Sequence, residues 1–388
     1  MPDHTRPLRS PAVDVSKADF RAGFSALLQQ ASPQVVRAST FFSLPADVPP
    51  WFDTGIDLTA GESVSVFAVG RTWLARELDM WVSPEVQLWY RIGEAGQVFR
   101  GTRCSHTFLT YDTGRLFLGN YFPAEWATRT GGIALGTEAY RQREGELCIL
   151  VVRWATAPLE GLKRLAAFGD IASLLSAEID RLEHPVNPPS DWEYLWFLGP
   201  AEIYTTGTPA PQRPSIVCHA HQEVGILHKD VSSPLSPDLR LRWSWKVETL
   251  PSQAREDLLP NHDYFSIAVE FDNGQDLTYF WSAELPPETG FRCRIPTWRA
   301  RETHVAVRSG HTELGRWRQE ERPLSVDYER FIGSLGKRDD GFDARVVPLP
   351  TRVVRVWLIA NTLFRRQEGR CEYGAIELHT GSKVMVVN

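Results

Sequence analysis

Hydrophobic and polar residues alternate with a period of two over much of the chain, a pattern typical of β-strands that bury one face. In residues 41–154, for example, Val64 and Val66 alternate with Ser63 and Ser65. Breaks that contain glycine recur about every ten residues, as turns between short strands require. The pattern predicts an all-β domain in this part of the chain.

Two stretches follow a helical period instead. Residues 16–30 begin with a Ser-x-x-Asp capping pattern and place Phe and Leu residues on one stripe, which predicts a short amphipathic helix. Residues 157–184 carry Leu and Ile at helical spacing, with an interruption at Gly169-Asp170, which predicts two short helices or one broken helix. The Pro-rich residues 185–191 cannot continue a helix and are expected to form a linker.

Strand patterns return from Trp192 onward, and a chain of 388 residues is long for a single core. The expected fold is mainly β, with two antiparallel, jelly-roll-like β-sandwich domains joined by a short helical connector. The expected parts are an N-terminal segment with a short helix (1–40), a first sandwich (41–156), the helical connector and linker (157–191) and a second sandwich (192–388).

The sequence HDYFSIAVEFDNGQDLTYFWSA, residues 262–283, predicts a hairpin with two different faces. A two-residue turn at Asn273-Gly274 would pair Phe271 with Asp276, because Asn-Gly is the strongest short hairpin signal. In that register one face is mainly apolar. The opposite face carries polar and aromatic side chains, namely Tyr264, Ser266, Glu270, Tyr279 and Trp281.

Three later segments, ETHVAVRSG, RVVRVWLIAN and CEYGAIELH, show the same alternation. If these strands share one sheet with the hairpin, they add further residues to the polar face, namely His304, Arg308, Arg355, Trp357, Tyr373 and Glu377. The alternative is that this face is the solvent side of an ordinary antiparallel sheet.

The predicted polar face would support two kinds of chemistry. Glu270 and Glu377 would act as paired carboxylates on a glycosidic bond. Tyr264, His304 and Arg308 would instead abstract a proton beside a carboxylate, with arginine neutralising the developing charge, a pattern similar to that of jelly-roll polysaccharide lyases. A flat ligand such as a sugar ring would stack on the aromatic rings. The expected ligand-binding residues are Ser266, Tyr279, Trp281, Arg355, Trp357 and Tyr373.

A candidate metal site lies in VCHAHQEVGILH, where His219 and His221 would point the same way from a strand, followed by Glu223. A His-x-His pair with a carboxylate can hold zinc or iron. The alternative is a hydrogen-bonded or exposed pair of histidines. The sequence contains no GxSxG, Walker, Rossmann, HExxH or EF-hand signature, so nucleotide chemistry loses support and no cofactor is expected from motifs.

The composition further limits the possible partners and the expected location of the protein. A net charge of −6 gives no basic footprint, so neither nucleic acid nor an anionic membrane is an expected partner. No stretch approaches the roughly 18–20 apolar residues of a membrane span, and the first residues lack a signal-peptide core, so a cytoplasmic location is expected. Five cysteines occur singly without CxxC spacing, which indicates reduced and mostly buried thiols.

The first predicted sandwich resembles the galactophilic bacterial lectins, whose pattern is W-x-DTGI-x-L-x-x-G followed by a G-x-L-x-LG strand. The segments that carry the resemblance are WFDTGIDLTAGESVSVFAVG (51–70), LWYRIGEAGQVFRG (88–101) and GRLFLGNYFPAEW (114–126). The resemblance covers roughly residues 51–154 and implies a small sandwich that binds a sugar through calcium. Asn120 matches the strand motif, whereas the final strand, 145–154, contains no Asp or Asn, so the calcium ligand cluster is not evident.

The second predicted sandwich resembles a domain-of-unknown-function family of bacterial concanavalin-like jelly-roll proteins. The resemblance rests on LRWSWKVETLP, DLTYFW, VRSGHTELGRWRQEERPLSVDY and YGAIEL, and it spans roughly residues 239–379. It implies a fold and no established activity.

The favoured function is recognition of a sugar-like or aromatic small ligand, with cofactor-independent acid–base chemistry of lyase or hydrolase type in the second sandwich. This interpretation predicts that Glu270, His304 and Glu377 converge in one cleft. One alternative is a non-catalytic, lectin-like binding protein, which predicts an open aromatic platform with dispersed carboxylates. A further alternative is a cyclase or isomerase of specialised metabolism that orients its substrate in an aromatic pocket.

Overall fold

The computed structural model describes residues 15–121, 126–133, 136–207, 215–258, 263–295, 297–333 and 347–388. Contacts within the chain divide it into two compact units, which are Met1–Val186 with Trp196–Pro200 (unit 1) and Asn187–Leu195 with Ala201–Asn388 (unit 2). Each unit contains two mostly antiparallel sheets that pack on a shared core. This arrangement confirms the predicted mainly β, sandwich class. None of the described helices has the length and hydropathy needed to span a membrane.

In the described residues of unit 1, two sheets enclose an aliphatic core that includes Val64, Val66, Leu118 and Ile149. The five-stranded sheet contains β1 (Val36–Pro45), β9 (Glu144–Trp154), β3 (Ser63–Ala75) and β4 (Met80–Val82) in that order, with β7 (Ser105–Leu109) paired to β3. The four-stranded sheet contains β2 (Phe52–Leu58), β8 (Gly114–Asn120), β5 (Leu88–Ile92) and β6 (Phe99–Arg100). Short helical turns lie between strands at Arg76–Leu78, Pro84–Gln87 (α2) and Thr137–Tyr140.

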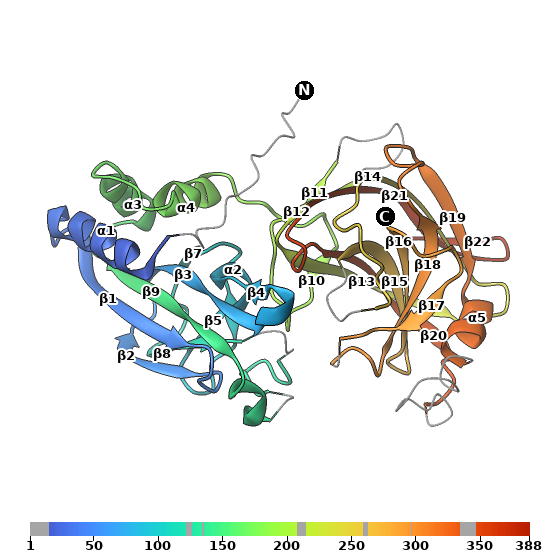
Figure 1. Cartoon of the computed structure of the whole chain (residues 1–388), viewed down its shortest axis with the longest axis horizontal. Coiled ribbons are helices and arrows are strands. Elements are labelled where there is room, and N and C mark those ends of the chain that lie inside the picture. The colour runs from blue at the N-terminus through green and yellow to red at the C-terminus, as the bar shows by residue number, and fades with distance from the viewer. Residues whose placement is uncertain are drawn as a thin grey trace. The chain divides into compact units, whose positions relative to one another are not determined.

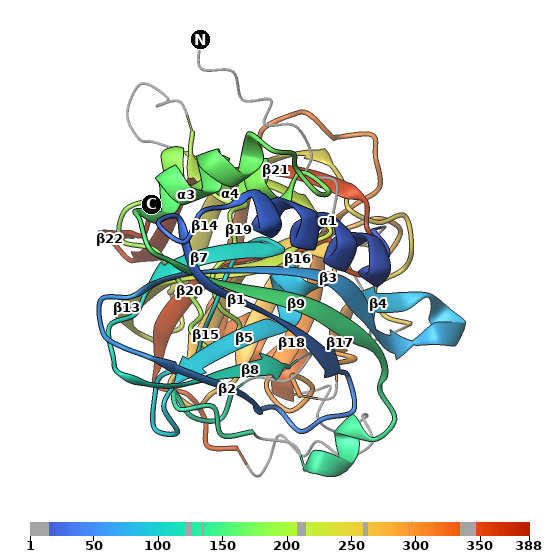
Figure 2. The ribbon, with the colours of Figure 1, turned by 90° about the vertical axis from the view of Figure 1, so that its left-hand side faces the viewer.

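Three helices cover the outer face of the five-stranded sheet, namely α1 (Lys17–Gln30), α3 (Pro158–Ala166) and α4 (Leu174–Glu183). Figure 2 shows them above the strands of this sheet. Ser16 caps α1 by accepting a hydrogen bond from the backbone N–H of Asp19, which confirms the predicted cap. Phe24 packs on Phe67 of β3 with ring centroids 5.0 Å apart. The stretch predicted as two helices or one broken helix is two helices, and both belong to unit 1.

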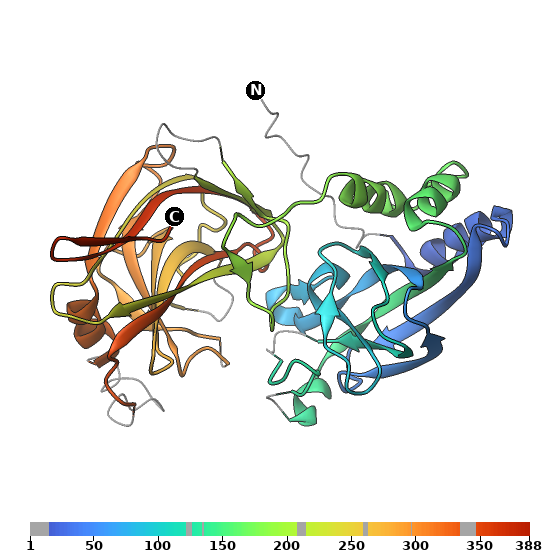
Figure 3. The same ribbon diagram turned by 180° about the vertical axis from the view of Figure 1, so that it is seen from behind.

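In the described residues of unit 2, a seven-stranded and a six-stranded sheet form the second sandwich (Figures 1 and 3). The seven-stranded sheet contains β10 (Glu193–Tyr194), β13 (Val224–Pro234), β20 (Arg352–Asn361), β15 (Tyr264–Phe271), β16 (Asp276–Ser282), β18 (Glu302–Ser309) and β17 (Gly290–Arg292). The six-stranded sheet contains β11 (Tyr204–Thr206), β12 (Ile216–His221), β21 (Glu368–Thr380), β14 (Arg240–Thr249) and β19 (Arg318–Pro323), with β22 (Lys383–Val386) paired to β21. A short helix, α5 (Leu324–Asp327), and a π-helical turn, Tyr328–Gly333, follow β19. The late strands β20 and β21 each lie between earlier strands near the middle of their sheets.

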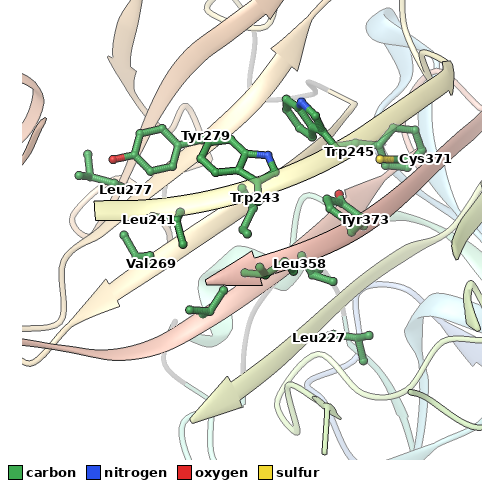
Figure 4. Packing of buried hydrophobic residues seen from close by; sticks show 14 of the residues in the cluster. Leu227, Leu241, Trp243, Trp245, Val269, Leu277, Tyr279, Leu358, Cys371 and Tyr373 are labelled. Carbon is green, nitrogen blue, oxygen red and sulfur yellow. The ribbon is translucent and has the colours of Figure 1, made fainter. Parts of the chain in front are cut away.

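Aromatic side chains join the two sheets of unit 2 (Figure 4). The ring of Trp243 on β14 stacks on Tyr279 of β16 with centroids 5.6 Å apart, and Trp245 lies 5.7 Å from Trp281. The polar atoms of three of these rings reach partners at the margin of the core. The hydroxyl of Tyr279 donates to Asp327 at 2.9 Å. Tyr279, Trp245 and Trp281 are therefore buried with their polar atoms satisfied, whereas the buried indole N–H of Trp243 has no hydrogen-bond partner within the described residues.

The β15–β16 hairpin is one residue out of the predicted register. The backbone N–H of Gly274 donates to the carbonyl of Phe271, and Gly274 has a φ of +77°. The turn is therefore a three-residue loop that needs glycine in the left-handed region, not a two-residue Asn-Gly turn. Val269 pairs with Leu277, whereas the predicted register pairs it with Thr278.

This slip decides which side chains share a face, because a shift of one residue exchanges the two faces of a strand. Tyr279 and Trp281 lie on the same side as Ile267 and point into the core, whereas Glu270 points to the other side. The prediction that Glu270 shares a face with the two aromatic rings is wrong for this reason.

A buried carboxylate joins the end of β20 to the start of β15. Asp263 is 1% exposed and accepts hydrogen bonds from the backbone N–H groups of Phe364 at 3.1 Å and Arg365 at 2.6 Å. Burial raises the pKa of Asp263 to about 7, against the opposing effect of these two N–H donors. The folded protein therefore holds a proton at Asp263 at pH values at which the unfolded chain has released it.

We expect Trp245→Ala to lower the free energy of unfolding of unit 2 by about 3–5 kcal/mol, because the substitution empties a fully buried ring site between the sheets. Denaturant unfolding followed by circular dichroism measures the change. The matched control is Trp317→Ala, since Trp317 is 46% exposed and its loss is expected to cost about 1 kcal/mol or less. Equal losses for the two variants would contradict the assigned core.

We expect the stability of the protein to fall between about pH 4 and pH 7 partly because of Asp263, whose folded-state pKa lies above its unfolded-state value. Its contribution is fully present below about pH 4 and is lost as the pH rises through about 7. Asp263→Asn should remove a downward slope of at most about 1.4 kcal/mol per pH unit. Denaturant titrations at half-unit pH steps compare the two proteins, and identical slopes would rule out the shift.

Candidate functional site

A pocket of about 340 Å³ lies on the outer face of the six-stranded sheet. It lies over the central strands β14 and β21 and the edge strand β19. Its lining includes Arg242, Ser244, Gln319, Glu321, Ala375 and Glu377. The pocket is therefore lined by charged, amide and hydroxyl groups on a rigid sheet.

A β-bulge lies at the floor of this pocket. Trp243 pairs with Ile376 and Trp245 pairs with Tyr373, so two residues of β21, Gly374 and Ala375, lie opposite the single residue between the two tryptophans. An extra residue in one strand reverses the alternation of the side chains beyond it. The bulge explains how Tyr373 points into the core while Glu377, four residues later, points outward.

Trp317 stands beside the bulge and is 46% exposed. A Cβ atom at Gly374 would lie 3.2 Å from Cζ3 of Trp317 and 2.3 Å from Oγ of Ser244, so only glycine lets both side chains approach this backbone. The ammonium of Lys246 lies 5.6 Å from the centre of the Trp317 ring. The ring of Trp317 is thus held against Gly374, next to Ser244 and Ala375 of the pocket lining, with nearly half of its surface open.

Charged side chains cross the face in register. Arg242 on β14 pairs with Glu321 on β19 and with Glu377 on β21, and its guanidinium forms an ion pair with Glu321. Glu377 is 2.7 Å from Nε2 of His379. Arg242 and Glu321 are each about half exposed, and ion pairs of this kind contribute little to stability. These polar groups are therefore accessible to a ligand.

The residues that the sequence predicts to form one site lie on the outer faces of two different sheets. The outer face of the seven-stranded sheet carries Tyr264, Ser266, Glu270, His304, Arg355 and Trp357. Glu377 lies on the outer face of the six-stranded sheet. The predicted convergence of Glu270, His304 and Glu377 is wrong, because the core of the sandwich lies between the two faces.

The predicted aromatic platform is wrong as well. Tyr279, Trp281 and Tyr373 have no exposed surface, since all three form part of the core. Ser266 is also fully buried, and Trp357 is 3% exposed with Trp298 packed edge-on against it at 5.9 Å. A ligand cannot stack on any of these rings without displacing packed structure.

Some predicted residues do come together in pairs. Arg355 forms ion pairs with Glu270 at 3.0 Å and with Asp230 at 2.8 Å, in a ladder across three neighbouring strands. Arg308 forms ion pairs with Glu320 and Glu313. Because their charges are paired within the protein, Glu270 and Arg308 are explained as parts of structural ladders.

Tyr264 and His304 also meet, within a buried polar cluster on the outer face of the seven-stranded sheet. Their rings are perpendicular with centroids 5.1 Å apart, and the hydroxyl of Tyr264 donates to Glu302 at 3.3 Å. Burial and the nearby carboxylate raise the pKa of Tyr264 well above its usual value. Tyr264 therefore stays protonated and acts as a donor.

The structure does not group the predicted metal ligands His219, His221 and Glu223. β12 ends at His221, and Gln222 has a φ of +61°, so the chain turns before Glu223. The imidazole of His219 is 2.9 Å from Glu368. Among the described residues, one group of three or more His, Cys, Asp or Glu side chains brings its ligating atoms within 4.8 Å of one another, and it consists of Cys293, Glu302 and His304.

In unit 1, the side-chain amide of Asn120 exchanges hydrogen bonds with the hydroxyl of Thr72 at 3.1–3.2 Å. The calcium site implied by the lectin resemblance stays a prediction.

Residues 190–377 match the model of a family described as protein of unknown function (DUF3047). This match agrees with the resemblance carried by the C-terminal motifs. A comparison with curated proteins finds no match.

Solved structures similar to this chain include an EclA N-terminal domain described as a PllA-like lectin, with 18% identity over 31% of this chain and 99% of that one and a TM-score of 0.24. Another is the xyloglucanase domain of NopAA, a type three effector from Sinorhizobium fredii, in complex with cellobiose. It is 10% identical and covers 52% of this chain and 96% of that one, with a TM-score of 0.29.

We expect Gly374→Ala to lower the free energy of unfolding by about 1–3 kcal/mol, because the new methyl group overlaps Oγ of Ser244. The double variant with Ser244→Ala removes that oxygen and should recover part of the loss. Denaturant unfolding of the single and double variants measures the coupling. Additive losses would show that Gly374 is not constrained by Ser244.

Proposed function

We propose that unit 2 binds a neutral carbohydrate in the pocket on the outer face of the six-stranded sheet. The observation that carries this proposal is the half-exposed ring of Trp317 beside a pocket of hydrogen-bonding side chains. The apolar face of a pyranose matches the face of an indole, and its hydroxyl groups match planar polar side chains at the margin.

The polar lining favours a sugar over a flat aromatic ligand. Arg242, Gln319 and Glu377 offer donors and acceptors whose loss of water has to be compensated by new hydrogen bonds. A sugar supplies many hydroxyl groups for this purpose, whereas an aromatic hydrocarbon surface supplies none. Both charge signs line the pocket, which favours a neutral ligand over a uronide.

Binding without catalysis fits the arrangement better than hydrolysis or elimination. A glycosidase places two carboxyl groups on either side of one bond, roughly 5–10 Å apart. Glu270 and Glu377 point away from opposite faces of the sandwich, so they cannot act on one bond. Glu321 and Glu377 share the pocket but flank the same arginine.

We expect Trp317→Ala to weaken sugar binding by about fivefold or more, since a lost stacking contact is worth about 1 kcal/mol or more. The probes are neutral β-glucan and galactan oligosaccharides, with an oligouronide as the charged comparison, and isothermal titration calorimetry measures Kd. The matched control is Tyr111→Ala, which removes an 87% exposed ring in unit 1 and should leave binding unchanged.

Two results would overturn the proposal. One is equal affinity of the wild type and Trp317→Ala for a neutral oligosaccharide. The other is no heat of binding with any neutral probe at millimolar concentration, while the protein is folded by circular dichroism.

A further inference from the structure

We propose that Cys293, Glu302 and His304 bind one zinc ion inside unit 2, remote from the sugar pocket. This inference is independent of the proposed function, because the three residues lie on the outer face of the seven-stranded sheet and the pocket lies on the six-stranded one.

The strand pairing brings the three residues together. β17 and β18 are antiparallel neighbours, and Phe291 pairs with His304. Two residues further along the two chain segments, the backbone N–H of Cys293 donates to the carbonyl of Glu302 at 3.0 Å. Since residues two apart on a strand face the same side, Glu302 and His304 project together and Cys293 lies beside them.

The distances suit a small cation. The ligating atoms of the three side chains lie within 4.8 Å of one another, and Nε2 of His304 is 3.3 Å from Oε2 of Glu302. Zinc bonds of about 2.0–2.3 Å in tetrahedral geometry separate neighbouring ligand atoms by about 3.3–3.8 Å. Imidazole and carboxylate already have this separation, and the thiol needs only a small movement.

The donor set selects the metal. Thiolate and imidazole are ligands of zinc and other late transition metals, whereas calcium and magnesium take oxygen ligands. Zinc most often has four ligands, and the fourth position is available to a water molecule or to a neighbouring oxygen of the cluster.

The surroundings resemble the outer shell of a metal site. The hydroxyls of Tyr264 and Thr278 both lie 3.3 Å from Oε1 of Glu302, and Thr278 also contacts Asp276 at 3.2 Å. Such hydrogen bonds orient carboxylate ligands. Oδ2 of Asp276 is buried and has no hydrogen-bond partner within the described residues. A divalent cation would offset two carboxyl groups that are both removed from water.

The burial assigns the ion a structural role. His304 is fully buried, with the ring of Phe291 stacked on it at 5.0 Å, and Cys293 is fully buried as well. A substrate has no access to such a position. Zinc would instead fasten Cys293, just after β17, to the start of β18.

The test begins with the full chain, equilibrated with one equivalent of zinc and passed through a desalting column. Elemental analysis should find about one zinc per chain, and zinc-edge X-ray absorption should show one sulfur neighbour among nitrogen and oxygen neighbours. Zinc should raise the unfolding temperature by on the order of 5 °C, and a chelator should reverse the shift.

Cys293→Ser and His304→Asn should each lower the zinc content at least tenfold and abolish the thermal shift. The matched control is Cys371→Ser, which changes another buried cysteine of unit 2 and should retain one zinc. If a variant fails to fold, the zinc-edge X-ray absorption spectrum of the wild type still shows whether a sulfur atom binds the zinc. Three results would overturn the proposal: bound zinc without a sulfur neighbour, a wild-type zinc content below about a tenth of an equivalent per chain, or an equal loss of zinc in Cys371→Ser. The three residues would then form a hydrogen-bonded cluster only.

Discussion

The packing of Trp243 against Tyr279 and of Trp245 against Trp281 is the contact on which the organisation of unit 2 depends. These rings fill the space between the two sheets, so the inner faces are closed to any ligand. Within the described residues of unit 2, the outer faces of the two sheets differ in how far a ligand can reach them. One is open and carries a polar pocket beside Trp317, while the other is largely buried and encloses a polar cluster.

Much of the fold follows from local sequence patterns. Ser16 and the Phe stripe specify α1, Gly169-Asp170 separates α3 from α4, and period-two alternation finds most strands. These features depend on neighbours a few residues apart. Which side chains lie on each outer face depends instead on single-residue irregularities, namely the loop at Gly274 in the seven-stranded sheet and the bulge at Gly374 in the six-stranded sheet. Side chains of a strand alternate between its two faces. One extra residue that the prediction misses therefore assigns every following side chain of that strand to the wrong face.

Two further limits concern side-chain chemistry. The polar atoms of Tyr279 and Trp281 do not keep these residues out of the core, because both atoms are hydrogen-bonded at its margin. The burial of His304 depends on rings from other strands, such as that of Phe291, and alternation along β18 contains no information about such neighbours. Trp317 lies just before β19, outside any alternating run, and only the approach of Gly374 shows its place.

The sheet order has a consequence for how unit 2 is made. β20 separates β13 from β15, and β21 separates β12 from β14, so both sheets lack a middle strand until residues 352–380 have left the ribosome. Until then, neither inner face has a complete opposing sheet that covers its tryptophan side chains. Folding dominated by such distant pairings is slow, and its intermediates expose apolar surface. Unit 2 therefore has a prolonged need for protection from aggregation during synthesis, whereas the strands of unit 1 are already available.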